Sequence, residues 1–151
     1  MSDEQSTEVT RARAALGHGL AIAPVGDGGL ARDLVWESSD GGRRLARVEG
    51  YECLAQDLTV ALLTPLGSDP FDARFGFAGL SVLTLDVSGR LAQELLRLSV
   101  AATLLADARV VEADVALDAG ERGSRSLAVV ASIRSLLDRT QTIELGEVPA
   151  P

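Results

Sequence analysis

The sequence has no lysine, one cysteine, one histidine and few aromatic residues. The single cysteine, Cys53, excludes a disulfide within the chain and is expected to be a small buried hydrophobe in a helix. Thiol catalysis would need a neighbouring base, and the one histidine, His18, lies in a glycine-flanked stretch near the N-terminus. One histidine and one cysteine also provide no ligand-spaced cluster for a metal ion. We therefore expect no thiol chemistry, no metal site and no cofactor.

Long apolar runs and a basic surface are also missing. No stretch approaches the roughly 18–20 apolar residues that cross a bilayer, and the acidic N-terminus lacks the apolar segment of a secretion signal. The net charge is −8, so we expect no nucleic-acid partner, because phosphate binding needs a concentrated positive face. The fourteen cations are all arginine, which fits either GC-rich coding or interface ion pairs. These features predict a cytoplasmic protein with no membrane insertion.

The chain has 151 residues, 46% of them hydrophobic, which matches one domain. We expect a flexible N-terminal tail and glycine-rich arm over residues 1–29, an α+β domain over 30–146 and a C-terminal tail over 147–151. A weak apolar stripe of Val9, Ala12 and Leu16 allows at most a frayed helix in the first part.

Two helices are predicted from apolar residues at helical spacing. The first spans about 51–63 and stops before Pro65, which cannot continue a helix. The second spans about 89–106, with Ser88 as its N-cap. The stripes expected to face the core are Tyr51, Leu54, Leu58, Ala61 and Leu62 in the first helix, and Leu91, Leu95, Leu98, Ala102 and Leu105 in the second.

Strands are predicted where apolar and polar residues alternate. Two short candidates, 30–37 and 43–48, flank a Ser-Ser-Asp-Gly-Gly turn and form a hairpin. A second hairpin joins a run from Arg109 to one ending near Arg134, and 140–145 forms a third strand. The residues expected on the inner face are Val111, Ala113, Val115, Leu117, Leu127, Val129, Ala131 and Ile133. The fold class is therefore α+β: a two-layer structure whose antiparallel sheet, including the C-terminal hairpin, packs against the two helices.

The loop over residues 67–79 contains all three phenylalanines of the chain, Phe71, Phe75 and Phe77. They either plug the end of the core or contact a neighbouring subunit. The sequence leaves both interpretations open.

Carboxylates near structural transitions were considered as a glycosidase-like pair. The candidates are Glu52, Asp57, Glu94 and Asp107. Nothing in the sequence puts two of them across a cleft, or one in an apolar pocket that would raise its pKa. A serine or threonine nucleophile also lacks a base. We therefore expect no enzyme, and a peptidoglycan hydrolase is the least favoured alternative.

The triplet Asp107-Ala108-Arg109 lies where the second helix gives way to a strand. Arg109 could interact with the last carbonyls of the helix. It could equally offer its planar fork to a carboxylate at an interface. Both roles remain open at the level of the sequence.

The order of these segments, from about Leu30 to Leu145, resembles the small baseplate wedge and sheath-initiator family of contractile phage tails and related injection systems. The residues that carry the resemblance are the helix and turn reading LAQDL and LLTPLG, which contains L-x-T-x-x-G, followed by Phe75-Gly76 and the helix-to-strand corner. The chain departs from the family at Gly67-Ser68-Asp69, where Gly-Glu-Arg is usual. Members of this family are sometimes described as lysozyme-like.

The resemblance implies a structural protein that docks on the baseplate wedge core and initiates sheath assembly. Asp107, Ala108 and Arg109 would replace the family's Glu-Pro-Arg triplet, which contacts the wedge core. The C-terminal strand would exchange with sheath subunits, through Thr140, Gln141, Thr142, Ile143, Glu144 and Leu145. The implied partners are wedge and sheath proteins, with the spike or hub and the inner tube as further candidates, in six copies around the baseplate of a cytoplasmic particle. A soluble adaptor or regulator of the same fold is the main alternative.

Overall fold

The computed structural model describes residues 2–25, 31–79, 81, 89–119 and 126–149. Within these residues the chain is α+β, with three helices and small antiparallel sheets. It divides into two compact units, Met1–Asp57 and Leu58–Pro151, and the boundary falls inside helix α2 (Gly50–Leu63).

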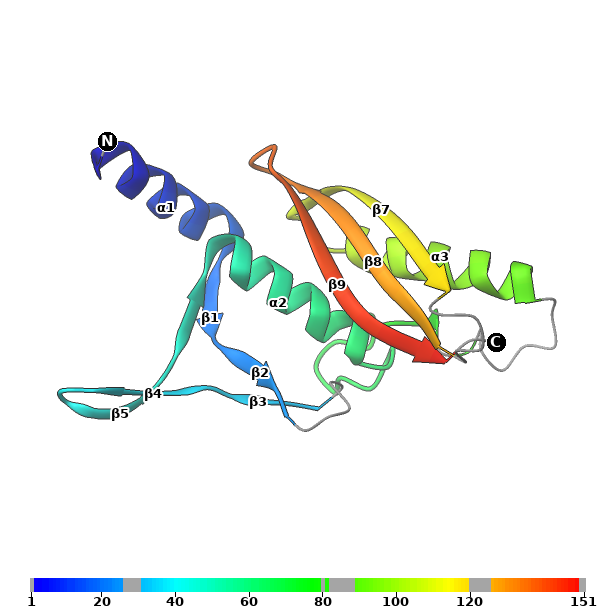
Figure 1. Ribbon diagram of the computed structural model, residues 1–151, viewed down its shortest axis with the longest axis horizontal. Helices are drawn as coiled ribbons and strands as arrows, with labels where there is room; N and C mark the ends of the chain where they lie inside the picture. The colour runs from blue at the N-terminus through cyan, green and yellow to red at the C-terminus, as the bar shows by residue number, and fades with distance from the viewer. Residues whose placement is uncertain (1, 26–30, 80, 82–88, 120–125, 150–151) are drawn as a thin grey trace. The chain divides into compact units, whose positions relative to one another are not determined.

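The first unit consists of helix α1, the start of α2 and three antiparallel strand pairs, which we call the arms. The pairs are β1 with β6, β2 with β3, and β4 with β5. Figure 1 shows the three arms diverging from one point. The elements are α1 (Ser2–Leu16), β1 (His18–Leu20), β2 (Ile22–Pro24), β3 (Arg32–Leu34), β4 (Trp36–Ser39), β5 (Gly42–Leu45) and β6 (Arg47–Glu49).

The N-terminal part differs from the flexible tail and arm predicted over residues 1–29. Helix α1 buries Ala12 and Leu16, and the chain then forms β1 and β2. Close packing with the start of α2 stabilises this arrangement: Gly50 has a φ of +62°, and a Cβ on it would lie 3.2 Å from the Ala12 Cβ. Its N–H donates to the Gly17 carbonyl at 2.9 Å. The pairing of β1 with β6 joins segments distant in sequence, so the local pattern could not predict it.

The predicted N-terminal hairpin is confirmed only around its turn. Strands β4 and β5 pair from Trp36 opposite Leu45 to Ser39 opposite Gly42. The run predicted over 43–48 is divided between β5 and β6, and β6 pairs with β1 instead. Gly42 has a φ of +109°, which glycine adopts with little strain and which closes the turn after Asp40-Gly41. The run predicted as one strand over 30–37 is divided into β3 and β4, which pair with different neighbours.

The second unit contains the end of α2, a loop, helix α3 and one three-stranded sheet. The sheet has the order β7-β8-β9, and α3 lies against β7 (Figure 1). Both predicted helices and all three predicted strands are confirmed; Ser88, the predicted N-cap, lies outside the described residues. The elements are α3 (Gly89–Leu105), β7 (Val110–Ala119), β8 (Ser126–Ser135) and β9 (Thr140–Pro149). The tail predicted from residue 147 is corrected, because β9 continues to Pro149.

One face of this sheet is buried and the other is polar. Buried residues on the inner face include Val115, Ala131 and Ile143, which the register aligns across the three strands. Glu112 and Asp114 on the opposite face are exposed, as predicted. Val111 was predicted to face inward but is 47% exposed. A shift of register between Val110 and Glu112 explains the difference, because an extra residue in a strand reverses the alternation before it.

Helix α3 buries a different face from the one predicted. The expected stripe began at Leu91, and Leu91, Leu98 and Leu105 are each about half exposed. The buried stripe begins one residue later and consists of Ala92, Leu96, Val100 and Leu104. Both stripes have helical spacing, so the periodicity predicted the helix correctly but could not decide which stripe faces the sheet.

The loop after α2 folds back on the end of that helix. The Phe77 N–H donates to the Thr64 carbonyl at 2.8 Å, and Leu66 donates to the Phe77 carbonyl at 3.1 Å. The three phenylalanines have different environments: Phe77 is buried, Phe75 is half-buried and Phe71 is 98% exposed. Phe77 therefore packs in the core, as the first interpretation predicts. Phe71 is exposed and is available for contact with a neighbouring subunit.

Gly76 is the glycine of this loop at which a positive φ coincides with a close approach of main-chain atoms. It has a φ of +114°, and a Cβ on it would lie 2.6 Å from the Thr64 carbonyl oxygen. We expect Gly76→Ala to lower the free energy of unfolding by more than about 2 kcal/mol, because it adds backbone strain and a clash with main-chain atoms. Urea denaturation would measure the change.

The matched control is Gly89→Ala at the start of α3, where a Cβ would meet no atom within 4 Å. This substitution should change the free energy of unfolding by no more than about 1 kcal/mol. Equal effects of the two substitutions would contradict the close approach at Gly76.

Candidate partner-binding site

The corner between α3 and β7 is closed by Asp107. After α3 ends at Leu105, the Asp107 N–H donates to the Leu104 carbonyl at 3.3 Å, and the Val110 N–H donates to the Asp107 carbonyl at 3.0 Å. The Asp107 carboxylate also accepts a hydrogen bond from the Arg109 backbone N–H at 2.9 Å. A side chain that binds the backbone two residues ahead is typical of an aspartate in a turn. Asp107 therefore ends the helix and directs the chain into the strand.

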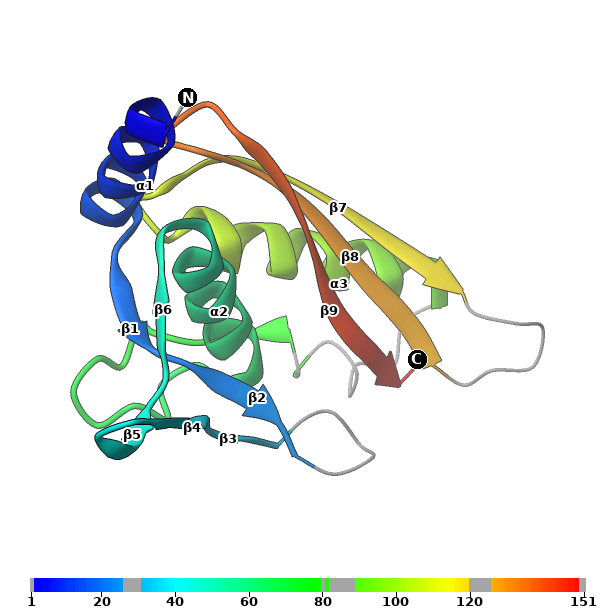
Figure 2. The ribbon, with the colours of Figure 1, turned by 60° about the vertical axis from the view of Figure 1, so that its left-hand side comes forward.

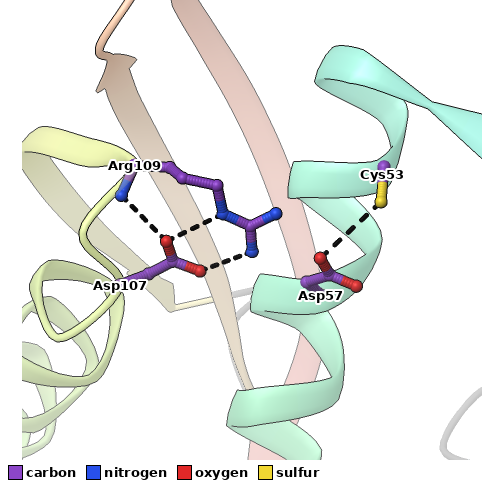
Figure 3. Close-up of polar contacts among 4 residues, drawn as sticks. All are labelled: Cys53, Asp57, Asp107 and Arg109. Carbon is purple, nitrogen blue, oxygen red and sulfur yellow. Dashed lines mark hydrogen bonds and ion pairs between the residues drawn. The ribbon is translucent and has the colours of Figure 1, made fainter. Parts of the chain in front are cut away.

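The guanidinium of Arg109 pairs with the same carboxylate. Nε lies 2.9 Å from one carboxylate oxygen and Nη2 lies 2.6 Å from the other (Figure 3). The side chains of Arg109 and Asp107 are 23% and 22% exposed, so both are largely covered. Two parallel charge-assisted bonds of this kind define the geometry of the fork. Ala108, between them, is exposed.

This ion pair lowers the pKa of Asp107. The hydrogen bonds from the Arg109 side chain are the largest cause; partial burial acts in the opposite direction, and the Arg109 backbone N–H adds to the lowering. The carboxyl is therefore charged throughout the neutral range. The sequence pattern did not predict that Asp107 is the partner of Arg109. The sequence feature that could have predicted this pair is an aspartate directly after a helix with an arginine two residues later.

The six residues predicted to exchange strands lie in the first part of β9. This strand pairs with β8 on one side, from Arg134 opposite Thr140 to Val130 opposite Glu144. It is the last strand in the order β7-β8-β9, so its other edge has no strand partner in the part of the chain that the structure describes. Ile143 is buried and Thr140 and Thr142 are exposed. The side chains of Glu144 and Leu145 lie outside what is described.

Gln141 differs from its neighbours in the strand. It is half-buried, and its Oε1 atom is shielded from solvent without a hydrogen-bond partner among the described residues. Its register partner is Ile133, a buried residue of the inner face. A buried acceptor without a donor costs free energy, so this is a strained position in β9.

The carboxylates considered as catalytic groups have other environments. Glu94 forms two hydrogen bonds with Arg97 on the surface of α3, which lower its pKa. Asp57 accepts a contact from the Cys53 thiol at 3.7 Å (Figure 3), and Glu52 is exposed. A general acid needs a raised pKa, and the pKa values of Glu94 and Asp107 move in the opposite direction. In the described residues, no three His, Cys, Asp or Glu side chains come together as a metal site would require.

The pairing of Asp107 predicts how stability depends on pH. A carboxyl whose pKa is lower in the folded state holds its proton more weakly there. Its contribution is complete above the ordinary aspartate pKa of about 3.9 and is lost as the pH falls through the lower folded-state value. We expect Asp107→Asn to reduce the free energy of unfolding by about 1–3 kcal/mol at neutral pH. The difference from wild type should shrink in acid, as denaturant unfolding at several pH values would measure.

Asp40→Asn is the control, since Asp40 is exposed in the hairpin turn. It should change the free energy of unfolding at neutral pH by no more than about 0.5 kcal/mol, as substitutions at exposed sites usually do. The difference in free energy of unfolding between wild type and Asp107→Asn could instead stay constant from neutral pH into the acid range. That result would show that the charge of Asp107 does not stabilise the fold.

In the described residues, no helix combines the length and the apolar character needed to cross a membrane.

The sequence was compared with protein families and with curated proteins. No family model matches it, and no curated protein matches it either. A function for this chain must therefore be inferred from its own residues.

Proposed function

We propose that this chain is a structural baseplate component of a phage-tail-like contractile injection system. It docks on the baseplate wedge core and starts sheath assembly by exchanging a strand with sheath subunits. The observation that carries the proposal is the open edge of β9, the terminal strand of the three-stranded sheet. An unpaired strand edge is a template for a strand of another chain, because its N–H and C=O groups are available for pairing.

The fold inferred with this function is a two-layer α+β structure with the antiparallel sheet on two helices. Support comes from α3, which lies against β7, and from burial that is confined to one face of the sheet. Such a layer leaves the edges of the sheet uncovered. Strand exchange requires that property.

The wedge-core contact is proposed at Asp107, Ala108 and Arg109. Ala108 is exposed at the corner. The ion pair between its two neighbours, Asp107 and Arg109, holds the backbone in one conformation. A prearranged corner loses little conformational freedom on binding. In this proposal the protein performs no chemistry. It assembles with wedge and sheath proteins in six copies within a cytoplasmic particle.

A double-mutant cycle separates a binding role of Arg109 from its structural role. Arg109→Ala should weaken binding to purified wedge protein by about tenfold, as loss of an interfacial arginine commonly does, and should also lower stability because Asp107 loses its partner. Asp107→Ala with Arg109→Ala should recover part of that stability, since no unpaired carboxylate remains. Its wedge binding should stay as weak as that of Arg109→Ala. Affinity and thermal midpoint would be measured for all variants.

If wedge binding instead follows stability in every variant of the cycle, the corner is structural only and the docking assignment is wrong. Ala73→Ser is a suitable control, because it alters an exposed alanine outside the corner and should leave both wedge binding and stability unchanged.

The strand-exchange role is tested at the exposed residue Thr142. Thr142→Lys should leave stability within about 0.5 kcal/mol of wild type, as substitutions at exposed sites usually do. It should slow sheath assembly, because a lysine on an edge strand discourages pairing with another chain. The measurement is the yield of sedimentable sheath when a strain that lacks this chain is complemented with each variant.

The matched control is Ala116→Lys, an exposed position on the same face but on the opposite edge strand, β7. It should assemble sheath normally. Sheath that forms normally in the complete absence of this chain would overturn the proposed function.

A further inference from the structure

The three arms of the first unit meet in a closed ring of backbone hydrogen bonds. Ala21 donates to the Ala46 carbonyl at 2.9 Å, Ala46 to the Val35 carbonyl at 2.8 Å, and Val35 to the Ala21 carbonyl at 2.9 Å. Each of the three segments passes through this junction and changes its pairing partner there. The ring therefore holds three two-stranded arms together at one point.

One side of the junction is covered by the first turns of α2 (Figure 2). The Gln56 side chain donates to the Leu20 carbonyl at 2.8 Å and accepts from the Ile22 N–H at 2.9 Å. A Cβ on Gly19 would lie 3.8 Å from the Cys53 Sγ. Val48, two residues beyond Ala46, is buried. Side chains two residues apart on a strand lie on the same face. Ala21 is therefore on the same face as Gly19, and Ala46 is on the same face as Val48. We call this the covered face of the junction.

The chain neighbours of the three ring residues therefore belong to the opposite face. They are Leu20, Ile22, Leu34, Trp36, Leu45 and Arg47. Five of these six are apolar, and the exposed fractions of Leu20, Leu34 and Trp36 are 43%, 41% and 55%. The register and the alternation also bring three exposed arginines to this face. We call it the junction face and define it as Leu20, Ile22, Leu34, Trp36 and Leu45 with Arg32, Arg43 and Arg47.

The junction face has an unusual balance of charge. In the described residues, Arg32, Arg43 and Arg47 make no ion pair, and the Arg43 guanidinium lies 5.3 Å from the centre of the Trp36 ring. Asp33 and Glu37 alternate to the other face, where Glu37 pairs with Arg44 at 2.8 Å. Within the described strands, the one acidic residue that alternates to the junction face is Glu49, and it is paired with Arg13. A protein of net charge −8 thus presents an apolar surface flanked by three arginines that have no ion-pair partner among the described residues.

We propose that the junction face binds a short acidic segment of another protein, whose apolar side chains pack on Trp36 and the leucines while its carboxylates pair with the arginines. Charge complementarity carries the choice of partner, because the three cations stand out on an acidic molecule. The net charge of −8 repels a highly charged partner, such as a second copy, a nucleic acid or an anionic membrane, more strongly than a short segment with a few carboxylates. Tryptophan and arginine beside exposed apolar residues are typical of strong binding positions.

This surface lies in the first unit and involves neither the corner nor β9. It therefore does not depend on the proposed role in sheath assembly. An adaptor of any kind could use the same surface.

The test uses the full chain and a short fluorescein-labelled peptide in which leucine and phenylalanine are separated by glutamate. Trp36 is the only tryptophan, so its emission should shift to shorter wavelength as the peptide covers it. Peptide polarization should rise in the same titration and fall with added salt. A peptide with lysine in place of glutamate, and one with serine in place of the apolar residues, should bind at least about tenfold more weakly.

Variants assign the binding to the junction face. Joint replacement of Arg32, Arg43 and Arg47 by glutamine should weaken binding about tenfold. Joint replacement of Arg11, Arg74 and Arg90 is the control, since these exposed arginines change the net charge equally and should leave binding unchanged. Trp36→Ser should weaken binding by about thirtyfold. If that variant does not fold, Leu34→Ser takes its place.

Three results would overturn the proposal. The lysine peptide could bind as tightly as the glutamate peptide. Vesicles of equal parts phosphatidylcholine and phosphatidylserine could shift Trp36 emission as strongly as the peptide does. Finally, the chain could form a dimer that Trp36→Ser abolishes, which would make a second copy the occupant of this face.

Discussion

Every strand of this protein must find partners for its backbone N–H and C=O groups, and the two units meet that requirement differently. In the first unit the strands are only three or four residues long, and a two-stranded pair of that size is marginal by itself. The ring formed by Ala21, Val35 and Ala46 joins three such pairs and lets each segment keep a partner throughout. In the second unit three ten-residue strands pair in sequence, and no strand of the described residues pairs with the outer edge of β9.

These two solutions lead to two kinds of surface. The junction uses small residues on the side that α2 covers, so the larger apolar side chains belong to the other side, with Trp36 among them. The three-stranded sheet buries one face and keeps the other polar, so its available feature is an edge. A side-chain surface suits a partner that supplies apolar and acidic groups. A backbone edge suits a partner that supplies a strand.

The corner at Asp107 shows how a short motif acquires a role from its surroundings. The sequence identified the position correctly as the end of a helix and the start of a strand. It offered Arg109 either helix carbonyls or a carboxylate of another chain. The carboxylate that Arg109 pairs with lies two residues away in the same corner. A spacing of two residues is too short for the usual side-chain pairs within a helix, and only the turn that follows α3 brings the two groups together.

The sequence by itself determined the α+β class, the limits of α2 and α3, the turn of the N-terminal hairpin and the three C-terminal strands. These follow from periodicity, from Pro65 and from glycine in turns, all of which act over a few residues. Tertiary structure alone decided which stripe of α3 is buried, because the Leu91 and Ala92 stripes are both compatible with a helix and the sheet selects between them. It also decided that residues 18–24 form strands, because β1 is stable only when β6 supplies its hydrogen bonds from a distant part of the chain. Local pattern specifies what a segment can form, while the partner that satisfies its backbone and covers its apolar face determines what it does form.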